Sequence, residues 1–177
     1  MAQISTVEYL GGLRTKAIHL ESGSEIYTDA PKDNEGRGEL FAPTDLVATA
    51  LASCMITIMG IMARRHGFDI KTTRAEIEKE MDNSPRRISA VRIHIHFPKN
   101  YTDKEKKLLE RTAYTCPVGK SLSDKLEEEI NMKPILDGNK IFEITGIKPG
   151  PKLGSLKDWI FRIQNEKNIW VYKRCRF

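Results

Sequence analysis

Two cysteines, Cys54 and Cys116, are the residues of this sequence best suited to covalent chemistry. Cys116 stands directly before Pro117 in the segment TCPVGKSL, where the sequence predicts the start of a helix. Free amide N–H groups and the positive dipole end of a helix stabilise a thiolate, so we expect a lowered pKa and a reactive sulfur at Cys116, with Lys120 adding positive charge one turn later. The alternative is a small residue that only fills a helix start.

Cys54 lies in the segment FAPTDLVATALASCM, inside a long predicted helix. At helical spacing it shares a face with Val47, Leu51 and Ile58. An apolar environment raises the pKa of a thiol, so this segment alone predicts an inert core cysteine. A reactive thiolate at Cys54 requires a cation held against the sulfur.

The helix around Cys54 has an unusual composition. Residues 46–63 carry no charge, which reaches the length expected of a membrane span. A helix that is apolar on all sides is either such a span or the buried centre of a globular protein. Small and hydroxylated residues interrupt the run, and we therefore favour a buried helix, with Thr44 as its N-cap, Asp45 in its first turn and Gly67 at its end.

The remaining elements indicate an α+β fold with helices gathered on one side of antiparallel sheet. Alternation predicts strands, and amphipathic or capped segments predict helices. The expected order is three strands, the long helix, two strands, two helices and two closing strands: 4–10, 14–20, 25–30, the helix, 70–82, 89–97, 102–115, 117–129, 130–136 and 140–147. Prolines and glycines near Gly146 mark a boundary, so we expect one domain over residues 1–146 and an extension over residues 147–177.

Taken together, the two cysteine segments resemble the OsmC/Ohr family of thiol peroxidases, in particular its less-characterised OsmC-like branch. The segments YLGGLRTKA and GELFAPTDL add to the resemblance, which covers residues 1–146. The resemblance implies an OsmC-like fold, in which antiparallel sheets wrap around the long central helices of an intertwined homodimer. It also implies two active sites at the subunit interface and no cofactor.

The resemblance assigns a role to each cysteine. Cys54 becomes the peroxidatic thiol that attacks an organic hydroperoxide and is oxidised to a sulfenic acid. Cys116 becomes the resolving thiol that forms a disulfide with Cys54, and a dithiol reductant then restores the enzyme. This chemistry serves oxidative stress defence. The alternative is a non-enzymatic protein of the same fold that binds a small apolar ligand at the dimer interface.

The family's peroxidases hold the thiolate with an arginine that an acid orients, and Arg14 best matches this arginine. Its fixed positive charge offsets the desolvation of a thiolate. The family's glutamate follows a proline, whereas Thr44 follows Pro43 in this chain. Glu39 and Asp45 are the two candidates for the missing acid.

Charge and cysteine content limit the other function classes. Of the net charge of +5, residues 147–177 carry +6 and the preceding residues −1, so the body offers no general nucleic-acid surface. The apolar spacing of Leu156, Trp159, Ile160 and Ile163 predicts a helix in this basic extension. Three cysteines without paired spacing, and no secretory leader, predict a cytoplasmic protein with reduced thiols, Cys175 being free and exposed.

His94 and His96 alternate on one predicted strand face, as metal ligands can. No third ligand is evident nearby in the sequence. We therefore expect a solvated strand face and no metal at these histidines.

Overall fold

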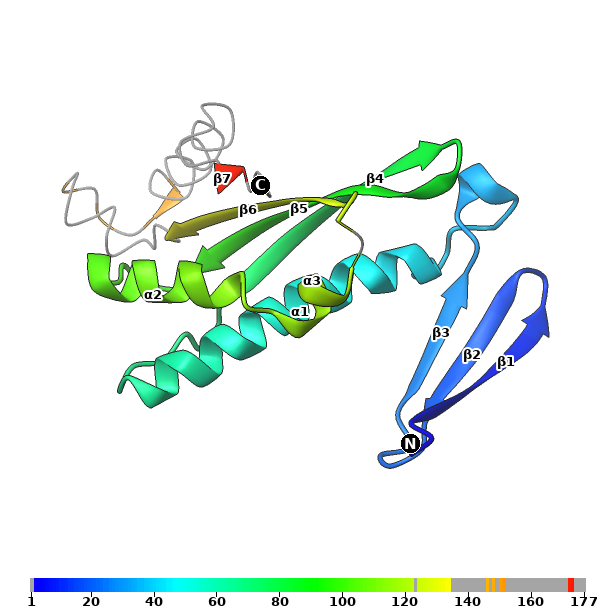
Figure 1. Ribbon diagram of the computed structural model, residues 1–177, viewed down its shortest axis with the longest axis horizontal. Coiled ribbons are helices and arrows are strands. Elements are labelled where there is room, and N and C mark those ends of the chain that lie inside the picture. Colours follow the sequence, from blue (N-terminus) through cyan, green and yellow to red (C-terminus); the bar gives the residue numbers. More distant parts are fainter. Residues whose placement is uncertain are drawn as a thin grey trace. The chain divides into compact units, whose positions relative to one another are not determined.

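The computed structural model describes residues 2–122, 124–134, 146, 148, 150–151 and 172–173. The chain divides into two compact units, Met1–Ala50 and Leu51–Phe177, each described by itself below. The boundary falls within the long helix α1 (Pro43–Arg65) (Figure 1). The expected boundary near Gly146 stays a prediction, because most of residues 135–177 lie outside the described residues, as do the closing strand 140–147, the predicted helix of the extension and Cys175.

The first unit contains an antiparallel meander of three strands. They are β1 (Ser5–Gly11), β2 (Arg14–His19) and β3 (Glu25–Asp29), in the order β1-β2-β3. Gly11 and Gly12 turn the chain between β1 and β2 with φ values of +84° and +58°, which glycine adopts without steric cost. A 3₁₀ turn, η1 (Lys32–Asn34), lies in the loop that leads to α1. The three predicted strands are confirmed.

The start of α1 differs from the prediction, whereas its end agrees with it. The helix begins at Pro43, so Thr44 lies inside the first turn and is not the N-cap. Pro is suited to a first helical position because its missing N–H has no partner there in any helix. After Arg65 the chain leaves the helix, and Gly67 takes a positive φ of +78°, as expected of a glycine that ends a helix.

The second unit is built on a mixed sheet. Strands β4 (Arg74–Asn83) and β5 (Arg86–Phe97) form a hairpin. Strand β6 (Glu127–Pro134) adds parallel to β5, and β7 (Tyr172–Lys173) pairs antiparallel with β6. Figure 1 shows α2 (Asp103–Ala113), α3 (Pro117–Ser121) and residues 51–65 of α1 on one side of this sheet. The predicted class is confirmed, but the β5–β6 pairing is parallel, since α2 and α3 form a crossover between the two strands.

The predicted helix 117–129 is only partly correct. Helix α3 ends at Ser121, and residues 127–129 belong to β6. Three consecutive glutamates favour a helix locally, but β6 aligns Ile130 with Ile93 of β5 and buries both side chains. Burial in the sheet therefore overrides the local preference for helix.

The core of the second unit lies between the sheet and its helices. Its fully buried side chains come from α1, β5 and α2, and they include Leu51, Met55, Met59, Val91, Ile93, Ile95 and Leu109. Helix α2 begins with a capping box, in which Thr102 accepts the Glu105 N–H and Glu105 accepts the Thr102 N–H.

Helix α1 has the length and mean hydropathy, 2.1, of a membrane span, and 33% of this apolar stretch is buried. Met55 and Met59 have no exposed surface, so the side of α1 that carries them packs in the core. Val47 and Ile61 remain exposed in the single chain. About a third of this stretch is thus buried within one chain, and exposed apolar side chains remain on the rest of the helix.

Candidate active site

The two cysteines of the second unit lie beside each other. Cys116 is the N-cap of α3, and its Sγ accepts the N–H of Gly119 at 3.5 Å. The same sulfur lies 3.9 Å from the carbonyl oxygen of Leu51 and interacts with the side chain of Cys54, which follows Leu51 by one helical turn. Both thiols are free; Cys116 is 1% exposed, and Cys54 is half-buried. The fold thus brings together two sulfurs that are 62 positions apart in the sequence.

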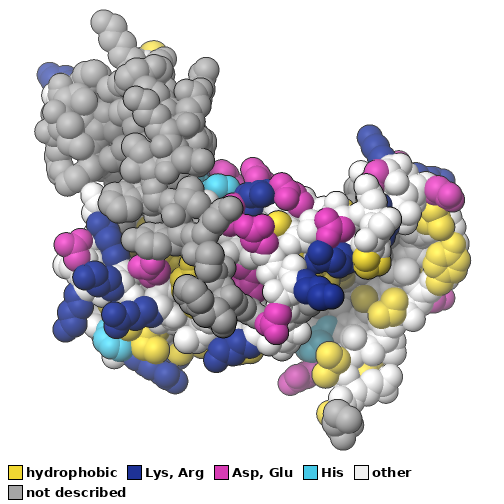
Figure 2. Space-filling view, turned by 45° about the horizontal axis from the view of Figure 1, so that its top comes forward, with side chains coloured by type: hydrophobic (Ala, Val, Ile, Leu, Met, Phe, Trp, Pro, Cys, Tyr) yellow, Lys and Arg dark blue, Asp and Glu magenta, His cyan; other side chains and the backbone are white. Residues whose placement is uncertain are grey.

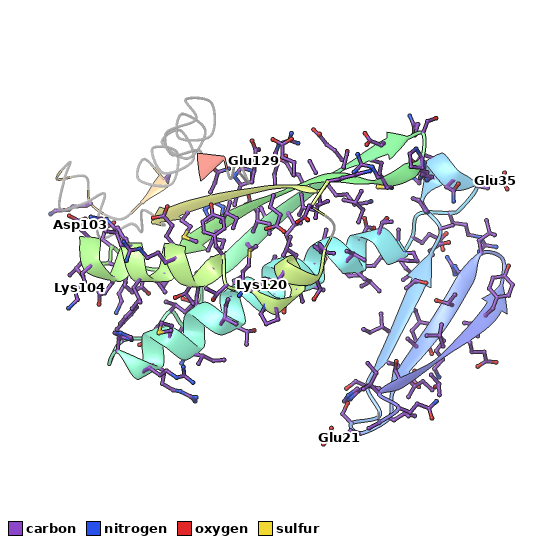
Figure 3. All side chains as sticks on the ribbon, in the orientation of Figure 1. Glu21, Glu35, Asp103, Lys104, Lys120 and Glu129 are labelled. Atoms are coloured by element: carbon purple, nitrogen blue, oxygen red, sulfur yellow. The ribbon has the colours of Figure 1, made fainter. Side chains whose placement is uncertain are left out.

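The pKa of Cys116 shifts in the direction opposite to the prediction. Burial, together with the neighbouring Cys54, raises the pKa of the Cys116 thiol to about 11, although the N–H of Gly119 acts in the other direction. Helix α3 has only five residues, so its dipole is small, while the sulfur has lost nearly all contact with water. Cys116 therefore rests as a neutral thiol at physiological pH. Lys120 is exposed at the end of α3 (Figure 3).

A charged cluster in the first unit contains Arg14. Arg14 is opposite Asp29 in the β2–β3 register, and its Nη2 lies 3.3 Å from Asp29 Oδ2. The same nitrogen pairs with Glu39, one of the two predicted acids. Asp45, the other candidate, instead accepts the N–H of Ala42 at 2.8 Å and holds the start of α1. The structure therefore brings together Arg14 and Glu39 and leaves Asp45 in a helix-capping role.

Asp29 was not predicted from the sequence, and it is fully buried. The N–H of Glu39, which donates to Asp29 Oδ2 at 3.1 Å, and the guanidinium of Arg14 hold the pKa of this carboxyl below its usual range. Glu39 in turn raises the pKa of Arg14. The cluster is therefore one cation between two carboxyl groups, which fixes the guanidinium at the end of β2.

Glu128 is a second acidic residue that sequence reasoning missed. It lies on β6 and is buried. A Cβ at Gly119 would lie 3.3 Å from Glu128 Oε1 and 3.3 Å from Leu51 Cδ1. The absent side chain of Gly119 therefore lets the carboxylate and α1 close directly on the backbone that donates to Cys116. The alternation of β6 could have identified Glu128 as inward-facing, had residues 127–129 been predicted as a strand.

The model of the family described as OsmC-like protein matches residues 36–131, a stretch that contains both thiols. This chain belongs to the OsmC-like family. A crystal structure of a proposed osmotic stress induced and detoxification response protein from Psychrobacter arcticus is similar: it is 50% identical, with a TM-score of 0.73 over 75% of this chain and 97% of that chain.

Two further similar proteins are more distant. An organic hydroperoxide resistance protein OsmC from Legionella pneumophila shares the fold, with 14% identity and a TM-score of 0.61 over 75% of this chain and 98% of that chain. An uncharacterized protein from Acinetobacter baylyi is 24% identical over 124 residues, which are 69% of this chain and 87% of the relative.

The two histidines of β5 differ from the expected solvated pair. His96 is buried, and its Nε2 lies 3.4 Å from Glu76 Oε2 on β4, while His94 is half-buried. Among the residues that the structure describes, no group of three or more His, Cys, Asp or Glu side chains is arranged to hold a metal ion.

Proposed function

We propose that this OsmC-like protein is a cytoplasmic, homodimeric thiol peroxidase that reduces organic hydroperoxides. The observation that carries the proposal is the placement of two free thiols beside each other, one half-buried on α1 and one buried at the start of α3. The family, and the detoxification and hydroperoxide-resistance names of its similar structures, support the same chemistry.

In the first step, the Cys54 thiolate attacks one oxygen of the O–O bond. The sulfur is oxidised to a sulfenic acid, and the other oxygen leaves as an alcohol after taking up the proton that Cys54 released on ionisation. Cys54 suits this step because its half-buried position leaves a path for the hydroperoxide, whereas Cys116 is closed to solvent.

In the second step, Cys116 attacks the sulfur of the Cys54 sulfenic acid. An S–S bond forms, and the hydroxyl of the sulfenic acid leaves as water with the thiol proton of Cys116. A pKa of about 11 keeps Cys116 neutral until this step, so it does not compete for peroxide. A dithiol reductant then cleaves the disulfide by two thiol–disulfide exchanges and leaves as its own disulfide.

We assign Arg14 as the cation of the site and Glu39 and Asp29 as the acids that orient it. The resemblance of GGLR to the family's arginine segment supports this role. The ion pair with Glu39 supports it as well, because Glu39 supplies the carboxylate that Thr44 cannot.

The apolar surface of the single chain supports a dimer. Val7, Tyr9 and Ile26 on the first sheet are exposed, and so is Ile61 on α1. Exposed apolar groups of this extent are characteristic of protein–protein interfaces. A dimer that covers them also shields the half-buried Cys54 from bulk water.

The test treats reduced protein with one equivalent of cumene hydroperoxide and maps disulfides by mass spectrometry. We expect a Cys54–Cys116 disulfide in the wild type and none in Cys54→Ser. Peroxide consumption by Cys54→Ser at the wild-type rate would refute the mechanism. A Cys54 sulfenic acid that never proceeds to the disulfide would refute the role of Cys116.

A second function is favoured by one observation. Thr44 occupies the position of the family's glutamate, which suits a non-enzymatic protein that binds a small apolar ligand at the dimer interface. Such a protein does not consume peroxide and carries the ligand through purification. Native mass spectrometry of the dimer distinguishes the two functions.

A further inference from the structure

A cavity on the second unit lies apart from the thiols. Its volume is about 500 Å³, within the usual range of small-molecule sites, about 300–1,000 Å³. The cavity is formed between the end of β5, helix α2 and strand β6, and neither Cys54 nor Cys116 lines it. It therefore belongs to no step of the proposed peroxide chemistry.

The walls of the cavity are apolar and partly rigid. They are formed by Phe97, Tyr101, Tyr114, Ile130 and Met132. Tyr101 is buried and donates its hydroxyl to the carbonyl oxygen of Asp69 at 2.8 Å. Its ring packs edge-on against that of Phe97, with 5.5 Å between the centroids. This wall exists before any ligand binds, so binding costs little ordering of the protein.

The rim of the cavity is charged, with an excess of positive charge. Lys99, Lys106 and Lys107 stand against Asp103 and Glu110. Lys99 places its ammonium 5.3 Å from the centroid of the Tyr101 ring. Asp103 is 4.0 Å from Lys106, a distance at which it only weakly neutralises that lysine. Figure 2 shows basic side chains gathered at the end of the second unit that carries α2.

An apolar chamber behind a rim of lysines matches one class of molecule. The occupant needs a linear or aromatic apolar body to fill the chamber and a single anionic head to meet the ammonium groups. The volume fits one alkyl chain, whereas a two-chain membrane lipid exceeds it. A basic peptide is disfavoured, because its charges would face the lysines of the rim.

We propose that this cavity is a binding site for a free medium-chain fatty carboxylate. The alkyl chain lies between the Tyr101 wall and the Ile130 and Met132 side chains of β6. The carboxylate is held at the rim by Lys106 and Lys107 of α2. The proposal stands independently of the proposed peroxidase, because it involves neither thiol.

The test uses calorimetric titration of the full-length protein with decanoate, 1-decanol and decyltrimethylammonium, all below their micelle concentrations. The three probes share a ten-carbon chain and differ in head-group charge. We expect decanoate to bind about tenfold more tightly than decanol and the cation to show no saturable binding. Equal affinity for decanoate and the cation would overturn the proposal, as would the absence of decanoate binding.

The variant Lys106→Gln/Lys107→Gln tests the rim. We expect it to weaken decanoate binding about five- to tenfold and to leave decanol binding unchanged. Lys104→Gln is the matched control, because Lys104 lies on the same helix, is exposed and does not line the cavity (Figure 3). If Lys104→Gln lost as much decanoate affinity, the general positive charge of α2 would explain the binding, and the role of the rim lysines would be refuted.

The location is tested by NMR of protein with ¹³C-labelled methionine methyl groups. Met132 is the methionine that lines the cavity, whereas Met55 and Met59 lie in the core. We expect decanoate to shift the Met132 signal, assigned from a Met132→Leu variant, and to leave the core methionines unchanged. A decanoate-dependent shift confined to the other methionines would place the ligand elsewhere. Cys54→Ser should bind decanoate as the wild type does, which separates this site from the peroxidase.

Discussion

The two compact units of this OsmC-like protein differ in how their apolar side chains are covered. In the second unit, Met55, Ile93 and Leu109 have no exposed surface. In the first unit, Ile4 and Val7 are 73% and 68% exposed. A sheet of three strands gains stability mainly from the face that it buries, and the apolar side chains of the first sheet are left largely uncovered in the single chain, whereas the core of the second unit is closed.

The residues of the candidate site are also divided between the two units. The second unit holds both thiols, and the first holds the cluster around Arg14. Thiol position and pKa are therefore properties of a complete core, whereas the guanidinium is placed by a sheet whose apolar side chains are exposed in the single chain. Changes to the two units should affect different quantities, and the following predictions test this.

The largest effect is expected from Cys116→Ser in the second unit. Without a resolving thiol, the Cys54 sulfenic acid is oxidised further to the irreversible sulfinic and sulfonic acids, each step consuming one more peroxide, so turnover with a dithiol reductant stops after about three equivalents of peroxide. The measurement is peroxide consumed per protein, with the mass of Cys54 recorded in parallel. Sustained turnover of this variant at the wild-type rate would contradict the proposed role of Cys116.

Arg14→Met in the first unit is expected to slow the first oxidation of Cys54 by about 100-fold, the usual cost of removing one positive donor at a reacting centre. Single-turnover kinetics under excess peroxide measure this rate. Lys16→Met is the matched control, since Lys16 lies on the same strand but pairs with Glu25 at 2.6 Å. If both variants slow the first oxidation of Cys54 equally, the loss comes from a general change in the sheet, and the assigned role of Arg14 is wrong.

Alkylation of Cys116 tests the second unit without peroxide. Because its pKa is raised from 9.0 to about 11, we expect iodoacetamide to modify it at pH 8 about 100-fold more slowly than the unfolded chain. Burial favours the neutral thiol of Cys116 in the folded protein. The stabilisation that follows from this raised pKa is therefore complete below pH 9 and is lost as the pH rises through about 11. Cys54→Ala removes one cause of the shift, and alkylation of Cys116 should accelerate.

A pair of glycine variants gives the smallest expected effect. Gly119→Ala places a Cβ 3.3 Å from Glu128 Oε1 and from Leu51 Cδ1, and we expect a loss of about 1–3 kcal/mol in the free energy of unfolding and slower disulfide formation. Gly60→Ala meets only Ile70, at 4.0 Å, and should be neutral or stabilising within α1. Denaturant titration measures both, and equal destabilisation would contradict the close packing at Gly119.

Local sequence patterns were sufficient where the structure is decided locally. The alternation that ends in Ile93, Ile95 and Phe97 predicted β5, and the amphipathic segment 102–115 predicted α2. The predicted boundary between α3 and β6 was wrong. Glu129 favours a helix by its local propensity, but in the folded sheet Arg92 of β5 lies 2.7 Å from its carboxylate. Contacts between strands that are distant in sequence decided this segment.

The candidate site divides in the same way. The two cysteine segments identified Cys54 and Cys116, because their types and flanking residues are visible in the sequence. Asp29 was missed because its pairing with Arg14 follows from the β2–β3 register, which no local pattern specifies. The pKa direction of Cys116 was wrong because a five-residue helix says nothing of how deeply its first sulfur is buried.

The parallel pairing of β5 with β6 has a consequence for biosynthesis. Cys116 lies within the crossover, so its final position depends on the addition of residues 127–134 to the edge of the β4–β5 hairpin. Pairing across so long a separation forms slowly compared with a hairpin. A nascent chain on the ribosome therefore exposes Cys54 before Cys116 has reached its place beside it, so the two thiols become neighbours only once β6 has joined the sheet.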